Sequence, residues 1–189
     1  MIPGRSIILA SKSPRRQQLL KELGYPFTVV TKEVEEIYPP HLVREQVPLF
    51  LAELKAKAFN ETLSEKDVVI TADTIVYCEG KILGKPLDFQ DATGILNMLS
   101  GKKHEVITGV CLHNKHTLYS FYVVTDVYFK TLSAEEISYY LERYQPYDKA
   151  GSYGIQEWIG LIGIEKIVGS YFNVMGLPVK ELHEALMKF

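Results

Sequence analysis

Short apolar runs alternate with amphipathic stretches along most of this chain. Residues 6–10 and 67–73 are continuous apolar runs rich in β-branched side chains, which predicts two buried strands. A helix is expected directly after the first of them, because Ser13 suits the N-cap, Pro14 the first helical position and Gly24 the C-terminal stop. The beginning of the chain therefore has the order strand, short loop, helix.

The rest of the chain continues this alternation. Helical spacing of apolar residues, with Ser133 and Glu136 as a capping box for one helix, predicts further helices over 48–59, 88–99, 133–143 and 179–187. Further strands are predicted over 27–31, 75–78, 81–83, 104–113, 116–131, 159–162 and 164–168. We expect a kink between the strands 67–73 and 75–78, followed by a small hairpin. On the long strand 116–131, alternation places one set of residues on a common face: Tyr119, Phe121, Val123, Val127 and Phe129.

Composition narrows the class of protein. With 189 residues, of which 47% are hydrophobic and 23% charged, the chain can bury a sizeable core, and we predict a single domain over residues 1–189. The net charge of −2 argues against a general nucleic-acid-binding protein. The two cysteines fit a reducing compartment, and we find neither a secretory signal nor an apolar run of the roughly 20 residues that a membrane span needs. A cytoplasmic protein without membrane partners is therefore expected.

A basic, hydroxyl-rich segment lies where the first strand meets the first helix. It reads Ser11-Lys12-Ser13-Pro14-Arg15-Arg16. Free N–H groups and the dipole at a helix N-terminus attract anions, and arginines bind phosphate oxygens bidentately. The segment predicts a phosphate site, although a capped helix with two solvated arginines is the simpler alternative.

Carboxylates are the next candidates for chemistry. Asp73 and Thr74 end an apolar strand, and ligands of open α/β sheets collect at the carboxyl ends of strands. Asp73 is thus placed to hold a metal or to activate water, or it simply caps a turn. Glu36, from an acidic turn, is a possible second carboxylate. If the two converge, a hard divalent ion such as Mg²⁺ suits them, with substrate phosphates completing its coordination.

Two lysines and a glycine-rich loop complete the set of candidates. Lys55 lies on a predicted helix, and Lys85 lies in the rigid loop Leu83-Gly84-Lys85-Pro86, although single lysines are usually surface residues. The loop 150–156 permits close backbone approach and ends in Gln156, whose amide can pair with a base edge, or it is a plain turn. The five histidines are scattered without ligand spacing, which gives no support to zinc or Ser-His-Asp chemistry.

Taken together, these segments resemble the Maf family of nucleoside triphosphate pyrophosphatases. The similar segments follow in order: ASKSPRR at 10–16, Glu36, ADT at 72–74, LGKP at 83–86, VVTDV at 123–127, DKAGSYGIQ at 148–156 and GSYFNVMGLP at 169–178. The resemblance implies an α/β fold with an elongated mixed sheet, flanking helices and two lobes around a nucleotide cleft, like that of the inosine triphosphate pyrophosphatases. It also implies a homodimer.

The resemblance further implies a reaction and a role for each residue. The enzyme would hydrolyse a nucleoside triphosphate between the α and β phosphates, with Asp73 as the catalytic proton acceptor. Glu36 and Asp73 would hold a divalent metal cation, Mg²⁺ or Mn²⁺. The substrate's phosphates would be bound by Ser11, Arg15, Arg16, Lys55 and Lys85.

The same resemblance favours one branch of the family. Arg15, Thr74 and Gln156 look like the branch that acts on dTTP and UTP, and a Gln amide complements the O4 acceptor and N3–H donor of uracil or thymine. Three alternatives stay open at this point: a pyrophosphatase for another base such as 7-methyl-GTP or a non-canonical nucleotide, a non-catalytic nucleotide-binding regulator of cell division, and RNA binding through the arginines and lysines.

Overall fold

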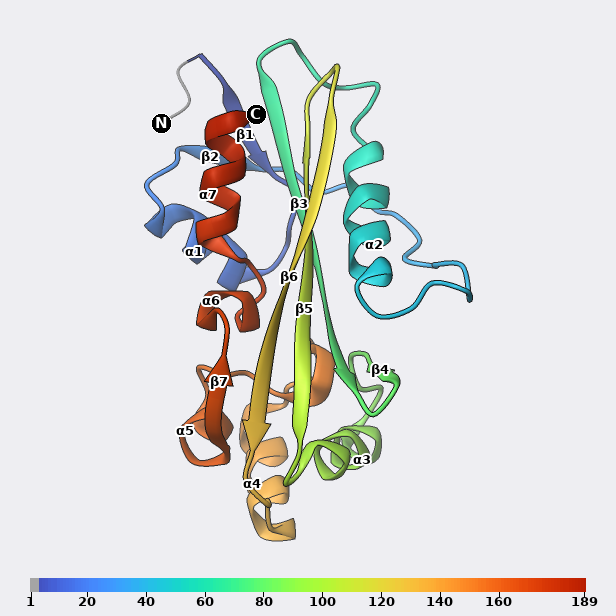
Figure 1. Cartoon of the computed structure of the whole chain (residues 1–189), viewed down its shortest axis with the longest axis vertical. Coiled ribbons are helices and arrows are strands. Elements are labelled where there is room, and N and C mark those ends of the chain that lie inside the picture. Colours follow the sequence, from blue (N-terminus) through green and yellow to red (C-terminus); the bar gives the residue numbers. More distant parts are fainter. Residues whose placement is uncertain (1–3) are drawn as a thin grey trace. The chain divides into compact units, whose positions relative to one another are not determined.

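The strands of the chain form one seven-stranded mixed β-sheet. The computed structural model describes residues 4–189, and the order of its strands is β2-β1-β3-β5-β6-β7, with β4 paired to β3 (Figure 1). The strands are β1 (Ser6–Leu9), β2 (Phe27–Val29), β3 (Asp67–Cys78), β4 (Lys81–Leu83), β5 (Lys103–His113), β6 (Leu118–Phe129) and β7 (Ile164–Val168). The helices are α1 (Pro14–Glu22), α2 (Gln46–Lys57), α3 (Phe89–Leu99), α4 (Ala134–Tyr144), a 3₁₀ turn η1 (Ala150–Ser152), α5 (Trp158–Gly163), α6 (Tyr171–Val174) and α7 (Val179–Lys188).

The chain divides into two compact units. The first contains the chain up to Asp73, together with residues 108–123 and 176–189, and the second contains residues 74–107 and 124–175. Strands β3, β5 and β6 contribute residues to both units. Within residues 4–189, no helix is long and apolar enough to cross a membrane.

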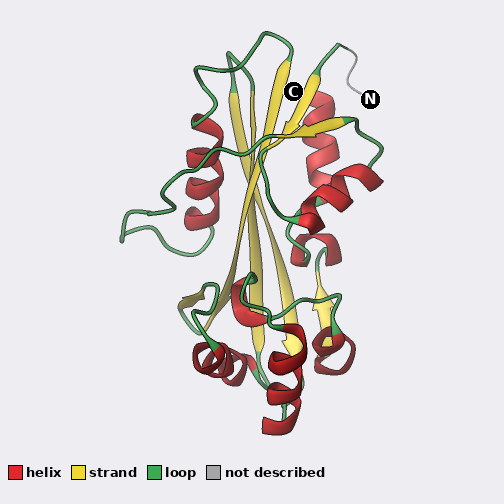
Figure 2. Cartoon of the chain, turned by 180° about the vertical axis from the view of Figure 1, so that it is seen from behind, coloured by secondary structure: helices red, strands yellow, loops and turns green. Residues whose placement is uncertain are grey.

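In the first unit, helix α1 begins where the sequence predicts it, and its apolar residues are buried. Ser13 has extended backbone angles and its side chain accepts a hydrogen bond from Arg16 N, so it caps α1 as predicted, with Pro14 at the first helical position. Leu19 and Leu20 of α1 are buried. Helices α1 and α7 lie on one side of the strands and α2 lies on the other, as both views show (Figures 1 and 2). This arrangement covers both sides of the strands with apolar helix faces.

Strand pairing in the first unit sets the position of the loop after β1. β1 is parallel to both of its neighbours, with Leu9 opposite Val29 of β2 and opposite Ile70 of β3. The pairing continues for one more residue, because Ala10 N donates to Ile70 O at 2.9 Å. The segment that begins at Ser11 therefore leaves the sheet beside residues 71–73 of β3.

The second unit is built around β4, the helices α3 to α6 and β7. The predicted capping box is confirmed: the Ser133 hydroxyl accepts from Glu136 N at 3.2 Å, and the Glu136 carboxylate accepts from Ser133 N at 2.9 Å. Helices α3 and α4 pack together, and their inward side chains Leu96, Leu99 and Leu141 are fully buried.

Three sequence predictions need correction. β3 is one continuous strand from Asp67 to Cys78 and not two, since β1 pairs with its first half and β4 with its end; the predicted hairpin with β4 is confirmed. Residues 159–162 lie in helix α5 and not in a strand; periodicity cannot assign so short an apolar run. On β6 the common face is buried at Val127 and Phe129, whereas Tyr119 is 48% exposed. The alternation on β6 therefore marks a buried face only in its second half.

His104 is a buried histidine of the second unit from which we expect a dependence of stability on pH. Its ring lies against Phe129 and Tyr153, with Nε2 2.8 Å from the Tyr153 hydroxyl, and burial lowers its pKa from 6.5 to about 3. The unfolded state binds a proton near pH 6.5 but the folded state does not, so stability is lost as the pH falls below 6.5 toward 3. We expect His104 to lower the free energy of unfolding by about 2 kcal/mol between pH 7 and pH 5.

Urea unfolding at the two pH values measures this effect. His104→Gln, which does not titrate in this range, should reduce the difference between the two pH values relative to the wild type. An equal difference in both proteins would exclude His104 as its source.

Candidate active site

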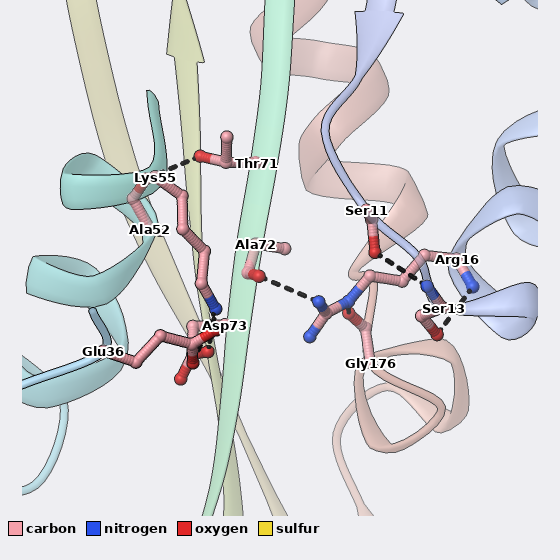
Figure 3. A network of polar contacts seen from close by, with 10 residues as sticks. All are labelled: Ser11, Ser13, Arg16, Glu36, Ala52, Lys55, Thr71, Ala72, Asp73 and Gly176. Atoms are coloured by element: carbon pink, nitrogen blue, oxygen red, sulfur yellow. Dashed lines mark hydrogen bonds and ion pairs between the residues drawn. The ribbon is translucent and has the colours of Figure 1, made fainter. Parts of the chain in front are cut away.

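Two carboxylates converge on one lysine in the first unit. Lys55 Nζ of α2 lies 2.6 Å from Asp73 Oδ1 of β3 and 3.0 Å from Glu36 Oε2 of the loop before α2 (Figure 3). The Lys55 and Asp73 side chains are only 17% and 14% exposed, whereas Glu36 is 50% exposed. Solvent therefore screens the Lys55–Asp73 pair less than a surface pair. The structure thus brings together three of the residues that the sequence predicted for the site.

Packing between α2 and the sheet sets the distance between Lys55 and Asp73. Thr71 Oγ1 donates to Ala52 O at 2.7 Å, which ties the middle of α2 to β3 two residues before Asp73. On β5, Gly109 faces the start of α2 so closely that a Cβ there would lie 2.5 Å from the carbonyl carbon and oxygen of Pro48. A side chain at position 109 would force the helix away from the strand.

Replacing this glycine should disturb the site from a distance. We expect Gly109→Ala to destabilise the protein by about 1–3 kcal/mol, since backbone must move to admit the methyl group, and to lower activity by displacing Lys55. Gly94→Ala is the matched control, because a Cβ at this position of α3 has no atom within 4 Å and alanine is the better helix former. Thermal unfolding and steady-state kinetics of both variants test this; equal behaviour of the two would contradict it.

The N-terminus of α1 follows β1 after the short loop 10–13. Ser11 is 7% exposed, and its Oγ accepts from Ser13 N at 3.2 Å, so this hydroxyl orders the first residues of the helix. No acidic residue lies in the first turn of α1, which carries Arg15 and Arg16 instead. Positive side chains at this end interact unfavourably with the helix dipole. An anion bound here would be stabilised by the dipole and by the two arginines.

The side chain of Arg16, on α1, binds backbone carbonyl groups of two other segments. Its Nη1 donates to Ala72 O at 2.8 Å, and its Nε donates to Gly176 O at 2.7 Å, so it links α1 to the residue before Asp73 and to the segment before α7 (Figure 3). Burial lowers the pKa of the Arg16 guanidinium, and the nearby charges of Asp73 and Glu36 oppose that shift. Arg16 therefore supports the backbone at Asp73 in addition to the phosphate role predicted for it.

The remaining predicted residues belong to the second unit. Thr74 is the next residue of β3 after Asp73, and Lys85 and Gln156 are exposed loop residues. Gly151 N donates to Gly84 O at 3.0 Å, so the loop that carries Lys85 adjoins the glycine-rich loop that ends in Gln156. Gly151 has φ +73°, and a Cβ there would lie 2.6 Å from Val76 Cγ2, which explains the glycine.

The donor set at Lys55 fits a hard divalent cation. Carboxylate oxygens of Asp73 and Glu36 converge on one point, and the Lys55 ammonium lies there. Mg²⁺ is usually bound through one or two carboxylates, with water and substrate phosphates as its other ligands. Among residues 4–189 there is no group of three or more His, Cys, Asp or Glu side chains that could hold a metal ion. Glu36 and Asp73 are the two side chains that would hold such an ion.

Sequence reasoning missed the supporting residues of the site. Thr71 and Gly109 read as ordinary strand residues, and nothing in their local pattern indicates contact with α2. The carbonyl groups of Ala72 and Gly176 have no side-chain signature at all. A detectable signal existed only for Arg16, as a second arginine next to Arg15 in a helical turn without acidic residues.

The protein is thus of the mixed α/β class, and it carries a cluster of carboxylate, lysine and arginine side chains beside the carboxyl end of a parallel strand and a helix N-terminus. The chain belongs to the Maf family, since the family model described as "Maf-like protein" matches residues 6–189.

Relatives in this family resemble the chain over nearly its whole length. A protein named dTTP/UTP pyrophosphatase from Bacteroides fragilis is 54% identical over 181 residues, which cover 95% of this chain and 94% of that protein. A protein of the same name from Flavobacterium johnsoniae is 51% identical over 95% of this chain and 93% of its own. A HAM1 protein structure from Coxiella burnetii matches with a TM-score of 0.53 at 15% identity, covering 98% of this chain and 100% of that one. This likeness confirms the predicted α/β fold class.

Proposed function

We propose that this chain is a pyrophosphatase that hydrolyses dTTP and UTP to the nucleoside monophosphate and pyrophosphate. The observation that carries this proposal is the 54% identity, over 95% of the chain, to a protein named dTTP/UTP pyrophosphatase. The geometry supports it, because a carboxylate, two more charged side chains and a helix N-terminus gather in the first unit.

Asp73 is the proposed proton acceptor for the attacking water. Its carboxylate ends the buried part of β3 in the first unit, and its Oδ1 is held by Lys55 while Arg16 binds the preceding carbonyl. A general base needs a fixed position with respect to its water, and these two contacts restrain both the side chain and its backbone. Beside Asp73, Lys55 contributes a positive charge and Glu36 a second negative charge.

The phosphates are assigned to the basic and hydroxyl-bearing residues. Ser11 and Arg15 at the start of α1, with Arg16 and Lys55, supply donors and positive charge in the first unit, and Lys85 supplies a further ammonium from the second. Phosphoryl transfer depends on neutralising the charge of the leaving pyrophosphate, which is the role of these groups. Glu36 and Asp73 would hold Mg²⁺ or Mn²⁺, which would polarise phosphate oxygens and add to that neutralisation.

Base selection is assigned to Arg15, Thr74 and Gln156. The amide of Gln156 offers both a donor and an acceptor, which suits the O4 and N3–H groups of uracil and thymine. Its exposed position on a glycine-rich loop leaves this edge accessible to a base.

We also propose a cytoplasmic homodimer. Cys78 and Cys111 are both free and buried, as expected in a reducing compartment. Tyr119 of β6, whose side chain is 48% exposed, supports an interface between copies, because exposed aromatic side chains are enriched at such surfaces.

A panel of nucleoside triphosphates tests the function. The purified protein is incubated with Mg²⁺ and dTTP, UTP, CTP, GTP, ITP or 7-methyl-GTP, and the products are separated by chromatography. We expect monophosphate and pyrophosphate, formed with the highest kcat/KM from dTTP and UTP. Preference for another base would contradict the roles of Arg15, Thr74 and Gln156. Saturable binding of a nucleotide without its hydrolysis, whichever divalent metal is added, would favour a regulatory nucleotide-binding protein instead.

A further inference from the structure

The glycine-rich loop of the second unit rests on the hydroxyl of a buried tyrosine. Tyr140 of α4 is fully buried, and its hydroxyl accepts a hydrogen bond from Gly154 N at 3.0 Å. The same hydroxyl donates to Glu157 Oε2. Tyr140 thus binds the loop two residues before Gln156 and one residue after it.

Glu157 is held from a second direction. Its Oε1 lies 3.0 Å from Lys149 Nζ, and Lys149 also pairs with Asp148 Oδ1 at 2.7 Å. The Lys149 and Glu157 side chains are 11% and 23% exposed, so this pair is well shielded from solvent. Burial and the bond to Glu157 raise the pKa of Tyr140, which keeps its hydroxyl protonated as the donor. Both ends of the loop 149–157 are therefore joined through one carboxylate.

The backbone of this loop at Gly154 lies close against the Glu157 carboxylate. A Cβ at Gly154 would lie 2.7 Å from the Glu157 carboxyl carbon and 2.8 Å from its Oε2. The glycine is thus needed for the carboxylate to reach Tyr140 beneath the loop. The cluster of Tyr140, Lys149, Gly154 and Glu157 is closely packed, whereas Gln156 between these contacts is exposed.

We propose that Tyr140 and Glu157 are positioning residues for base recognition, which hold the backbone on both sides of Gln156 so that its amide meets the base in one orientation. The inference rests on the proposed function, in which Gln156 reads the pyrimidine edge. Uracil presents an acceptor at position 4 and a donor at N3, whereas cytosine presents a donor and an acceptor there. An amide that rotates freely pairs with both, so discrimination requires a fixed loop.

The selectivity for UTP over CTP, given by the ratio of their kcat/KM values, tests this proposal because the two nucleotides differ only at that edge. We expect Tyr140→Phe and Glu157→Gln to lower this ratio at least about fivefold, mainly through a higher KM for UTP, with kcat within about twofold of the wild type. Tyr144→Phe is the matched control, since Tyr144 stacks on the Tyr140 ring at 5.2 Å but is not part of these hydrogen bonds.

A double-mutant cycle separates positioning from a structural role. In a Gln156→Ala background, Tyr140→Phe should change the ratio by less than about twofold, because the group it positions is gone. Unchanged selectivity in Tyr140→Phe and Glu157→Gln, or additive effects in the cycle, would overturn the proposal. If thermal unfolding shows that Tyr140→Phe does not fold, Glu157→Gln, which keeps the size of the side chain but removes the negative charge that pairs with Lys149, decides the question. A wild-type protein that hydrolyses neither nucleotide would contradict the proposed function itself, and this inference with it.

Discussion

Asp73→Asn should lower kcat for UTP by about a thousandfold or more. The amide keeps the size of the side chain but is far less basic, and a positioned general base contributes about 10²–10⁴ in rate. It also removes one of the two negative charges that converge on Lys55, at a distance of 2.6 Å from its ammonium, and with it a proposed metal ligand. Pyrophosphate release in steady state, with saturating Mg²⁺ and UTP, measures the effect.

Asp67→Asn is the control for this substitution. Asp67 begins the same strand, where its carboxylate accepts from Ser64 N at 2.8 Å in a surface turn. This variant should retain activity close to that of the wild type. Nucleotide binding by Asp73→Asn, measured by calorimetry, should persist, because the proposed phosphate ligands are intact. Turnover by Asp73→Asn within tenfold of the wild type would refute the proposed mechanism.

Lys55→Met should have the second largest effect, with kcat/KM for UTP lowered by about a hundredfold or more. Methionine keeps the apolar stem of the side chain and removes the ammonium that lies between Asp73 and Glu36. The two carboxylates then repel each other without a counter-charge, and the proposed triphosphate site loses one of its positive charges. Steady-state kinetics at several Mg²⁺ concentrations measure the loss and whether added metal reduces it.

Lys57→Met on the same helix is the matched control. Lys57 pairs with Glu53 at 3.4 Å, and its side chain is 57% exposed, so the pair contributes little to the stability of the protein. Its removal should leave kcat/KM within about twofold of the wild type, as expected for a solvated pair. Similar losses in the two variants would mean that the effect of Lys55 comes from the general charge of α2 and not from its contacts.

Local patterns predicted the elements that depend on nearby residues alone. Ser13 and Pro14 indicated the start of α1, and Ser133 with Glu136 indicated the start of α4, because capping is completed within one turn of the helix. The apolar run 159–162 predicts a strand but forms part of a helix, since a few apolar residues fit either period. Continuity of β3 also escaped prediction, because it depends on partners that are distant in sequence.

The residue types available for the chemistry, and their places relative to strand and helix ends, follow from the amino-acid sequence: Ser11 and Arg15 lie at a helix N-terminus, and Asp73 lies at the end of an apolar run. That Glu36, Lys55 and Asp73 meet at one point, and that Arg16 binds the carbonyl groups of Ala72 and Gly176, is visible in the folded chain alone. The physical reason is that convergence depends on how closely α2 packs against the strands, and close packing depends on long-range contacts such as those of Thr71 and Gly109, which no local period encodes.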